Sequence, residues 1–336
     1  MTAMLEVSHL STEFATENGT VQAVRDVSLE VGKGEILGIV GESGSGKSQT
    51  MYSVMGLLAG NGRVAEGDIK IDSKDISPKN YTKAEYESIM EDIRGNDMAM
   101  IFQDPMTFLN PVLTIGSQLM EPILNHNNVS QAEAKERAIK LLKQVGIPSP
   151  ETRLKQYPFE FSGGMRQRII IAMALACDPK VIIADEPTTA LDVTIQAQVL
   201  DLIGDLRTQI DSSIIMITHD LGVVASICDR IAIMYGGKIV EIGTAEEIFY
   251  EPKHEYTKGL LSCVSNPEDK EKKELHPIPG SPPDLLNIGD WCPFVDRCES
   301  AMKICKMKMP DKTKYSDTHE ASCWLAHPLA KERSGE

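Results

Sequence analysis

The clearest chemistry in this chain lies in an eight-residue segment rich in glycine and serine. It reads Gly-Glu-Ser-Gly-Ser-Gly-Lys-Ser and matches the phosphate-binding pattern G-x-x-x-x-G-K-[ST]. The glycines let backbone N–H groups point into one concavity that holds phosphate oxygens, and a following helix adds partial positive charge. The alternative interpretation, a Gly/Ser-rich turn between a strand and a helix, does not explain why Lys47 and Ser48 occupy their positions in the pattern. Residues predicted to contact nucleotide are Gly41, Ser43, Gly44, Ser45, Gly46, Lys47, Ser48 and Gln49.

Two of these residues have sharper roles. Lys47 is expected to reach the β- and γ-phosphates, and the Ser48 hydroxyl is expected to ligate Mg²⁺. Two carboxylates, Asp185 and Glu186, end a second apolar segment that begins at Val181. Asp185 is placed to organise the magnesium through its water shell, and Glu186 to orient or deprotonate an attacking water. The plainer interpretation is an ordinary strand that ends in acidic surface residues.

Three further sites complete the set of candidates. Ser162, Gly163 and Gly164 open a helical pattern, which by itself is only another helix start that favours anions. Gln103 follows a short apolar strand, and His219 ends the apolar strand 214–218. A single histidine after a strand is more often structural than functional, so His219 gains weight only from the other motifs.

The elements around these residues alternate between strand and helix. Strands are expected at 5–10, 23–31, 36–40, 67–71, 99–102, 181–184, 214–218, 231–235 and 238–242, and helices at 47–57, 82–93, 114–146, 162–176, 194–210 and 221–228. Such alternation predicts an α/β fold with a mostly parallel, helix-covered sheet. The helical stretch from 114 to 161 interrupts it and is interpreted as an inserted subdomain. Gly236 and Gly237 predict a tight hairpin turn, and the Pro-rich segment 267–283 a linker.

Composition restricts the class of protein. The 336 residues are 42% hydrophobic and 25% charged, as in a globular protein able to bury a core. The formal charge of −15 argues against wholesale binding to nucleic acid. No apolar run reaches membrane-spanning length, and the N-terminus lacks the form of a secretory signal, so we expect a cytoplasmic protein. Seven cysteines in such a compartment favour metal binding or catalysis over disulfides.

In this order, the motifs resemble those of the ATP-binding-cassette (ABC) family over about residues 4 to 265. Ser162 to Gly164 match its Leu-Ser-Gly-Gly-Gln signature, although Phe161 and Met165 replace the Leu and Gln. The resemblance implies that Gln103 senses Mg²⁺ and the γ-phosphate, that His219 contacts the γ-phosphate, and that Asp192 lies in a loop through which two ATPase subunits communicate. It also implies that Phe14 stacks on adenine, with a core phenylalanine as the alternative.

The resemblance extends to a subfamily. The segment from Phe102 to Pro111 and the segment Ile278–Pro283 are similar to those of ATPases that serve oligopeptide and dipeptide importers. The implied function is ATP hydrolysis that drives peptide import by nucleotide-dependent closure of an ATPase dimer. The same subunit type serves nickel and glutathione importers, and a soluble ABC ATPase not coupled to transport is a further alternative. The sequence does not identify the cargo.

The resemblance also implies partners, a location and a domain division. We expect a related second ATPase in a heterodimer, two membrane permease subunits, an extracellular binding protein indirectly, and peripheral attachment to the cytoplasmic face of the membrane. The expected fold is a P-loop NTPase (RecA-like) core with an N-terminal antiparallel β subdomain. The nucleotide-binding domain would span 1–265, with its helical subdomain at about 104–165, and a C-terminal extension would span 266–336.

The extension carries four cysteines: Cys292, Cys298, Cys305 and Cys323. Their gaps of five, six and seventeen residues lack the close C-x₂₋₄-C pair of common zinc sites and miss common ferredoxin spacings. Spacing alone therefore gives four potential thiolate ligands on a small loop-rich unit. The similarity to peptide-importer ATPases implies an iron–sulfur cluster, [4Fe–4S], at these positions; zinc and free or oxidised thiols are the alternatives.

Overall fold

The computed structural model describes residues 3–103, 108–188, 193–209, 211–263, 277–327 and 330. The chain forms two compact units. The first contains residues 1–6, 30–36 and 69–217, and the second contains residues 7–29, 37–68 and 218–336. The chain passes from one unit to the other within the long N-terminal strands, so each unit is assembled from separate stretches of sequence.

The first unit is built on parallel strands. β7 (Val181–Asp185) pairs with β6 (Met98–Ile101) on one side and with β8 (Ser213–Thr218) on the other. Nearly continuous apolar residues are expected where both faces of a sheet are covered, and every residue of these strands is buried. Parallel strands end at the same edge of a sheet, so the residues after β6 and β7 lie on one side.

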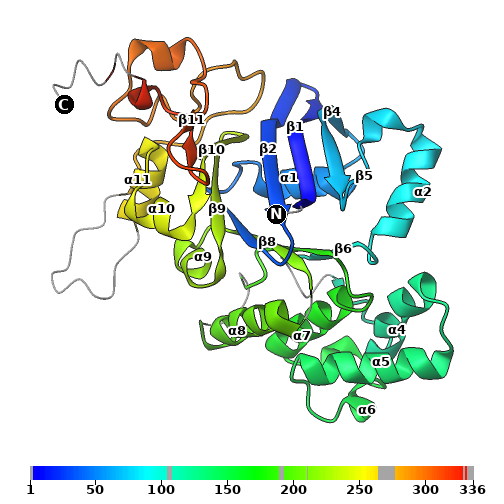
Figure 1. The fold of residues 1–336 in the computed structure, drawn as a ribbon. Coiled ribbons are helices and arrows are strands. Elements are labelled where there is room, and N and C mark those ends of the chain that lie inside the picture. Colours follow the sequence, from blue (N-terminus) through cyan, green and yellow to red (C-terminus); the bar gives the residue numbers. More distant parts are fainter. Residues whose placement is uncertain are drawn as a thin grey trace, which may run out of the picture. The chain divides into compact units, whose positions relative to one another are not determined.

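Helices form a lobe in the same unit, where α4, α5 and α7 pack against one another (Figure 1). The helical pattern predicted from 114 to 146 is two helices, because Ser130 starts a new one by forming a capping box with Glu133. The capping box of Thr82 and Glu85 is also present. The helices of this unit are α2 (Lys83–Ile93), α4 (Ile115–His126), α5 (Gln131–Gln144), α6 (Pro150–Arg153), α7 (Gly163–Ala174) and α8 (Val193–Gln209).

The second unit contains the strand that leads to the phosphate loop. β3 (Ile36–Val40) pairs in parallel with β9 (Arg230–Tyr235), which forms a hairpin with β10 (Lys238–Thr244). The predicted tight turn is present, with φ values of 55° and 78° at Gly236 and Gly237. The chain's C-terminal part adds β12 (Glu320–Ala321) to β10 and β11 (Thr313–Lys314) to β12. The extension is thus continuous with this sheet.

The remaining elements complete the architecture. A four-stranded sheet has the order β2-β1-β4-β5. Its strands are β1 (Ala3–Thr16), β2 (Gly19–Gly32), β4 (Gly62–Ile71) and β5 (Lys74–Asp75). The helices of the second unit are α1 (Lys47–Val54), α9 (Leu221–Ile227), α10 (Ala245–Tyr250) and α11 (Glu255–Ser262). Short 3₁₀ turns lie at Pro78–Asn80, Pro158–Glu160, Lys303–Lys306 and Trp324–Ala326.

All the strands predicted from the sequence are present, with boundaries that differ by a few residues. The largest difference is at the N-terminus, where β1 and β2 each run for 14 residues. Residues 267–276 of the predicted linker lie outside the described part of the chain, and 277–283 contain no helix or strand. The proposed boundary between residues 265 and 266 stays a prediction.

Candidate nucleotide site

The phosphate loop connects β3 to α1, as the sequence predicts. Two of its glycines are required by their surroundings. A Cβ on Gly41 would lie 2.1 Å from the carbonyl oxygen of Met234, and one on Gly46 would lie 2.3 Å from that of Ala23. Gly46 also has φ 101°, a conformation that other residues rarely adopt. The loop is therefore pressed closely against β2 and β9.

Hydrogen bonds between its own residues hold the loop in shape. The buried ammonium of Lys47 donates to the carbonyl oxygens of Gly41, at 2.7 Å, and Glu42, at 3.0 Å. The Ser45 N–H donates to the same Glu42 carbonyl, at 3.2 Å. The buried Ser45 hydroxyl has no hydrogen-bond partner among the described residues. Phosphate oxygens would supply acceptors for these donors, and Mg²⁺ suits the half-buried hydroxyl of Ser48. The donor set therefore fits a magnesium nucleotide.

Two residues that touch the loop escaped the sequence analysis. Tyr256, on α11, accepts a hydrogen bond from the Glu42 N–H at 2.9 Å. Arg297, in the extension, forms an ion pair with the Glu42 carboxylate at 2.7 Å. Burial raises the pKa of Tyr256 above its ordinary value, so its hydroxyl is neutral when it accepts this bond. No sequence motif marks either residue, because they lie more than two hundred positions from the loop.

The second set of candidates lies in the first unit, at the ends of β6 and β7. The side-chain amide of Gln103 donates to a carboxylate oxygen of Glu186 at 2.8 Å. Asp185 is buried, and Glu186 has φ 46°, a strained conformation for a residue that is not glycine. The Glu186 N–H donates to the Ile217 carbonyl of β8 at 2.9 Å. The structure thus brings together Gln103 and Glu186, which the sequence separates by more than eighty residues.

The signature residues begin α7, as predicted. The Ser162 hydroxyl caps the helix by accepting from the Met165 N–H. Gly163 is exposed, with nothing near the position of an added Cβ. A Cβ on Gly164 would lie 2.7 Å from Cγ2 of Ile195, so this glycine is needed for packing against α8. This helix start is open to solvent.

Three predicted residues remain. His219 follows the last residue of β8 and is exposed. Phe14 is half-buried on β1, and its ring lies where a Cβ on Gly62 would come within 2.6 Å. Asp192 lies outside the described residues. The phosphate loop and His219 belong to the second unit, and the signature, Gln103 and the two carboxylates to the first. The assigned roles of all these residues stay predictions.

Comparison with known proteins identifies the family. Residues 24–189 match the ABC transporter family, and residues 240–305 match the C-terminal region of oligopeptide/dipeptide transporters. The dipeptide transport ATP-binding protein DppD of Bacillus subtilis is 52% identical over 332 residues, covering 98% of this chain and 97% of that protein. The oligopeptide transport ATP-binding protein OppD of Salmonella typhimurium is 50% identical over 307 residues, covering 91% of this chain and 89% of that protein.

The chain belongs to the ATP-binding proteins of oligopeptide and dipeptide ABC transporters. Its fold also matches solved ABC cassettes. The dimeric ATP-binding cassette MJ0796 bound to ADP and Pi aligns with a TM-score of 0.62 and 26% identity, over 72% of this chain and 99% of that one. The cassette CbiO1 of Clostridium perfringens has the same TM-score and identity. The predicted P-loop NTPase fold is confirmed.

The four cysteines of the C-terminal extension were predicted to hold a [4Fe–4S] cluster, and the structure does not support that prediction. Burial raises the pKa of Cys292 to about 12 and that of Cys298 to about 11, with further contributions from neighbouring thiols of the set. The four cysteines of this ABC protein thus lie near one another. Among the described residues, however, no group of three or more His, Cys, Asp or Glu is arranged to hold a metal ion. The [4Fe–4S] prediction is not supported by this geometry.

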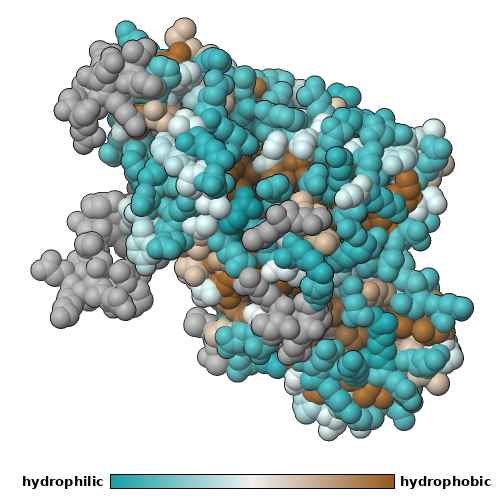
Figure 2. Space-filling view, viewed as in Figure 1, coloured by the Kyte–Doolittle hydropathy of each residue, from teal (hydrophilic) through white to brown (hydrophobic). Residues whose placement is uncertain are grey.

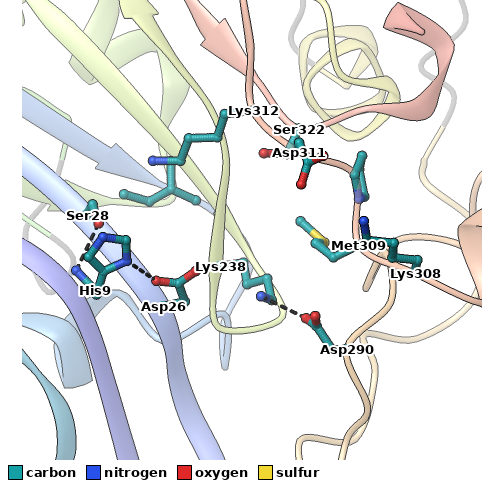
Figure 3. Close-up of a pocket in the computed structure, with 12 residues that line it drawn as sticks. His9, Asp26, Ser28, Lys238, Asp290, Lys308, Met309, Asp311, Lys312 and Ser322 are labelled. Atoms are coloured by element: carbon teal, nitrogen blue, oxygen red, sulfur yellow. Dashed lines mark hydrogen bonds and ion pairs between the residues drawn. The ribbon is translucent and has the colours of Figure 1, made fainter.

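A separate cavity of about 320 Å³ in the second unit contains none of the predicted nucleotide residues. Figure 3 shows that its charged groups come from β1, β2, β10 and the extension. Two polar pairs lie there: His9 Nδ1 is hydrogen-bonded to the Asp26 carboxylate at 2.7 Å, and Lys238 forms an ion pair with Asp290 at 3.1 Å.

Within the described ranges, none of the helices combines the length and apolar character required to span a bilayer.

Proposed function

We propose that this chain is the ATP-hydrolysing subunit of a di- or oligopeptide importer. Similarity over nearly the whole length to transport ATP-binding proteins supports the assignment. The observation that carries it is structural: the Gln103 amide is hydrogen-bonded to the Glu186 carboxylate at the carboxyl end of the parallel strands. A candidate water-activating group is thereby tied to a candidate sensor of the γ-phosphate and Mg²⁺.

Each residue has a role that its environment supports. Lys47 would exchange its two loop carbonyls for phosphate oxygens when ATP binds, and the loop N–H groups would hold the remaining oxygens. Ser48 and Asp185 would hold Mg²⁺, which supplies charge neutralisation at the β- and γ-phosphates. Glu186 would accept a proton from the attacking water, oriented by its bond to Gln103. The exposed His219 would contact the γ-phosphate.

The signature would act on a neighbouring subunit's nucleotide. Ser162 and Gly163 are exposed at the start of α7, so their N–H groups and the helix dipole are open to an incoming phosphate. Phosphoryl transfer depends on positioning and charge stabilisation, so splitting these donors between two subunits makes hydrolysis conditional on closure. We propose a related, different ATPase as the partner, which gives a heterodimer.

The helical lobe is the proposed docking surface for two membrane permease subunits. Large apolar side chains are exposed there, among them Phe108, Val112, Leu113 and Phe159. Figure 2 shows apolar surface on this lobe, at the lower right. Attachment through this surface would hold the chain at the cytoplasmic face of the membrane as a peripheral subunit. Co-purification with two integral membrane proteins and a second ATPase tests this arrangement and excludes a soluble ABC ATPase.

The decisive variant is Glu186→Gln in the assembled complex. It should abolish turnover at this chain's site while ATP stays bound, because the amide cannot accept the proton. Trapped nucleotide and phosphate release measure the two effects. Glu136→Gln, on the exposed surface of α5, is the matched control. Full activity of the Glu186 variant at this site would refute the assignment.

The cargo is a finer part of the proposal, supported by the named relatives. Reconstituted complex should transport peptides of graded length and should not transport nickel or glutathione. Transport of either control in place of peptides would assign the chain to another branch of the subfamily.

The iron–sulfur cluster also stays a proposal. Four thiols gathered near one another in a largely buried region support it, and the absence of a metal-holding group among the described residues speaks against it. Protein purified without oxygen should show broad visible absorbance that disappears in Cys298→Ser. Stoichiometric zinc in the same sample, or colourless protein, would refute the cluster.

A further inference from the structure

Arg297 lies in the cysteine-bearing extension, yet its side chain is directed at the phosphate loop. Only 7% of the side chain is exposed. One guanidinium nitrogen, Nη1, donates to the Glu42 carboxylate at 2.7 Å and to the Tyr235 hydroxyl at 3.0 Å. Nε and Nη2 donate to the carbonyl oxygens of Pro279 and Ile278, at 2.8 and 3.1 Å. The guanidinium therefore joins the extension, β9 and the loop.

The backbone N–H, the backbone carbonyl and the side-chain carboxylate of Glu42 each have a bonding partner. Its N–H donates to Tyr256, its carbonyl oxygen accepts from Lys47 and Ser45, and its carboxylate pairs with Arg297. The ring of Tyr256 in turn lies against that of Tyr235, with centroids 4.3 Å apart. The second residue of the loop is thus fixed from outside by α11 and by the extension, and from inside by its own loop.

The charge of Glu42 gives the ion pair a second effect. A carboxylate in the phosphate loop repels the phosphates of ATP, and this repulsion is strong where water is largely excluded. The Arg297 guanidinium cancels that charge, and its planar shape lets it serve four acceptor groups at once. Loss of Arg297 would both release the loop and leave an uncompensated negative charge beside the nucleotide.

We propose that Arg297 is a positioning residue for ATP: it holds the phosphate loop through Glu42 and so makes tight nucleotide binding depend on the C-terminal extension. The inference rests on the proposed function in that ATP is taken as the ligand. Arg297 contacts no nucleotide itself and acts only through Glu42. Because Cys298 is the next residue, a change in the cysteine region would reach the loop by the same path.

The test is a double-mutant cycle on the full-length chain. Arg297→Gln, Glu42→Gln and the double variant keep the side-chain sizes similar while they remove one or both charges. The ATP dissociation constant is measured for each, with the thermal unfolding midpoint without nucleotide as the control for folding. We expect Arg297→Gln to weaken ATP binding about tenfold. In the Glu42→Gln background the same change should have an effect of about twofold or less.

Two further variants keep the test decisive. Ser316→Ala removes a contact of the extension with Glu247 on α10 that involves no residue of the loop, and should leave ATP binding unchanged. Arg297→Lys keeps the charge but loses the planar fork, and should give an intermediate affinity; it replaces the glutamine variant if that variant does not fold.

The outcomes separate this inference from the proposed function. An undiminished effect of Arg297→Gln in the Glu42→Gln background, or unchanged affinity in the single variant, would overturn the inference. If the unmodified chain does not bind ATP, the proposed function itself fails, and this result is read before any variant is compared.

Discussion

Two helix starts in this molecule present backbone N–H donors to an anion, one in an enclosed loop and the other on an exposed surface. The phosphate loop precedes α1 and the signature precedes α7, and both offer backbone N–H groups next to serine and glycine. The loop is enclosed: Gly41 and Gly46 leave no room for a Cβ, and Lys47 is buried. The signature is open at Gly163, which has nothing within 4 Å of an added Cβ, whereas Gly164 packs against α8.

The difference indicates two ways of preparing an anion site. The enclosed loop is shaped in advance by its own unit, so we expect it to bind nucleotide in a single chain. The open helix start has exposed donors, and in the proposed mechanism a second molecule encloses them. The following predictions test whether these two regions differ as described.

Lys47→Ala should have the largest effect on nucleotide binding. The variant lacks the buried ammonium that would bind the phosphate oxygens of ATP in place of the loop carbonyls. The affinity for ATP should therefore fall by about 100-fold or more. Ser162→Ala should leave the affinity of the isolated chain within about twofold while lowering hydrolysis in the assembled complex. Equilibrium binding and ATPase assays measure both. An equal loss of affinity in the two variants would contradict the contrast.

Gly46→Ala should be the most destabilising change to the backbone. Its φ of 101° and the nearby Ala23 carbonyl give a cost of about 2 kcal/mol or more in the free energy of unfolding. Gly163→Ala should instead be neutral or stabilise by about 0.5 kcal/mol, because alanine favours helix and meets nothing there. Denaturant unfolding of both variants gives the comparison, and similar losses would mean that the signature is as enclosed as the loop.

Acid should loosen the region that supports the loop. His254 is fully buried, and burial lowers its pKa from 6.5 to about 4. Its Nδ1 accepts from the Tyr256 N–H, so it must stay neutral in the folded chain. The unfolded chain binds the proton more readily between these values, so stability is present above pH 6.5 and is lost as pH falls toward 4. The unfolding midpoint should drop by about 2–4 °C over this window.

His254→Asn provides the control for this pH effect. Asparagine keeps a side-chain cap at the start of α11 but does not titrate. The variant should therefore lose much of the pH dependence between 6.5 and 4, whatever its absolute stability. An unchanged slope would assign the effect to other groups.

The smallest expected effect concerns the Ser162 cap. Its hydroxyl accepts from the Met165 N–H at 3.4 Å, a long bond at an exposed helix start. Ser162→Ala should lower the free energy of unfolding by about 0.5–1 kcal/mol. Thr82→Ala, which breaks the reciprocal capping box with Glu85, should cost at least as much. A much larger loss at Ser162 would show that this serine, like Gly164, has an internal packing role.

Much of the fold and of the candidate site followed from local sequence. Apolar strands such as 181–185 and 214–218, and the caps at Thr82 and Ser130, depend on neighbours a few residues away, so pattern reading finds them. The single helical pattern at 114–146 did not predict its division into α4 and α5, although Ser130 and Glu133 have the residue types and spacing of a capping box. The cysteine spacing suggested a ligand set, yet proximity of thiols did not amount to a metal-binding geometry among the described residues.

The sequence by itself determined the ATP-binding motifs, their order and the family, because each motif is a short run whose residue types have one main chemical use. Only the tertiary structure decided what holds the phosphate loop in place. Arg297 and Tyr256 meet Glu42 across more than two hundred residues, and that meeting depends on how β9, α11 and the extension pack. Long-range packing leaves no local signature in the chain, so the support of the loop could be seen only in the folded molecule.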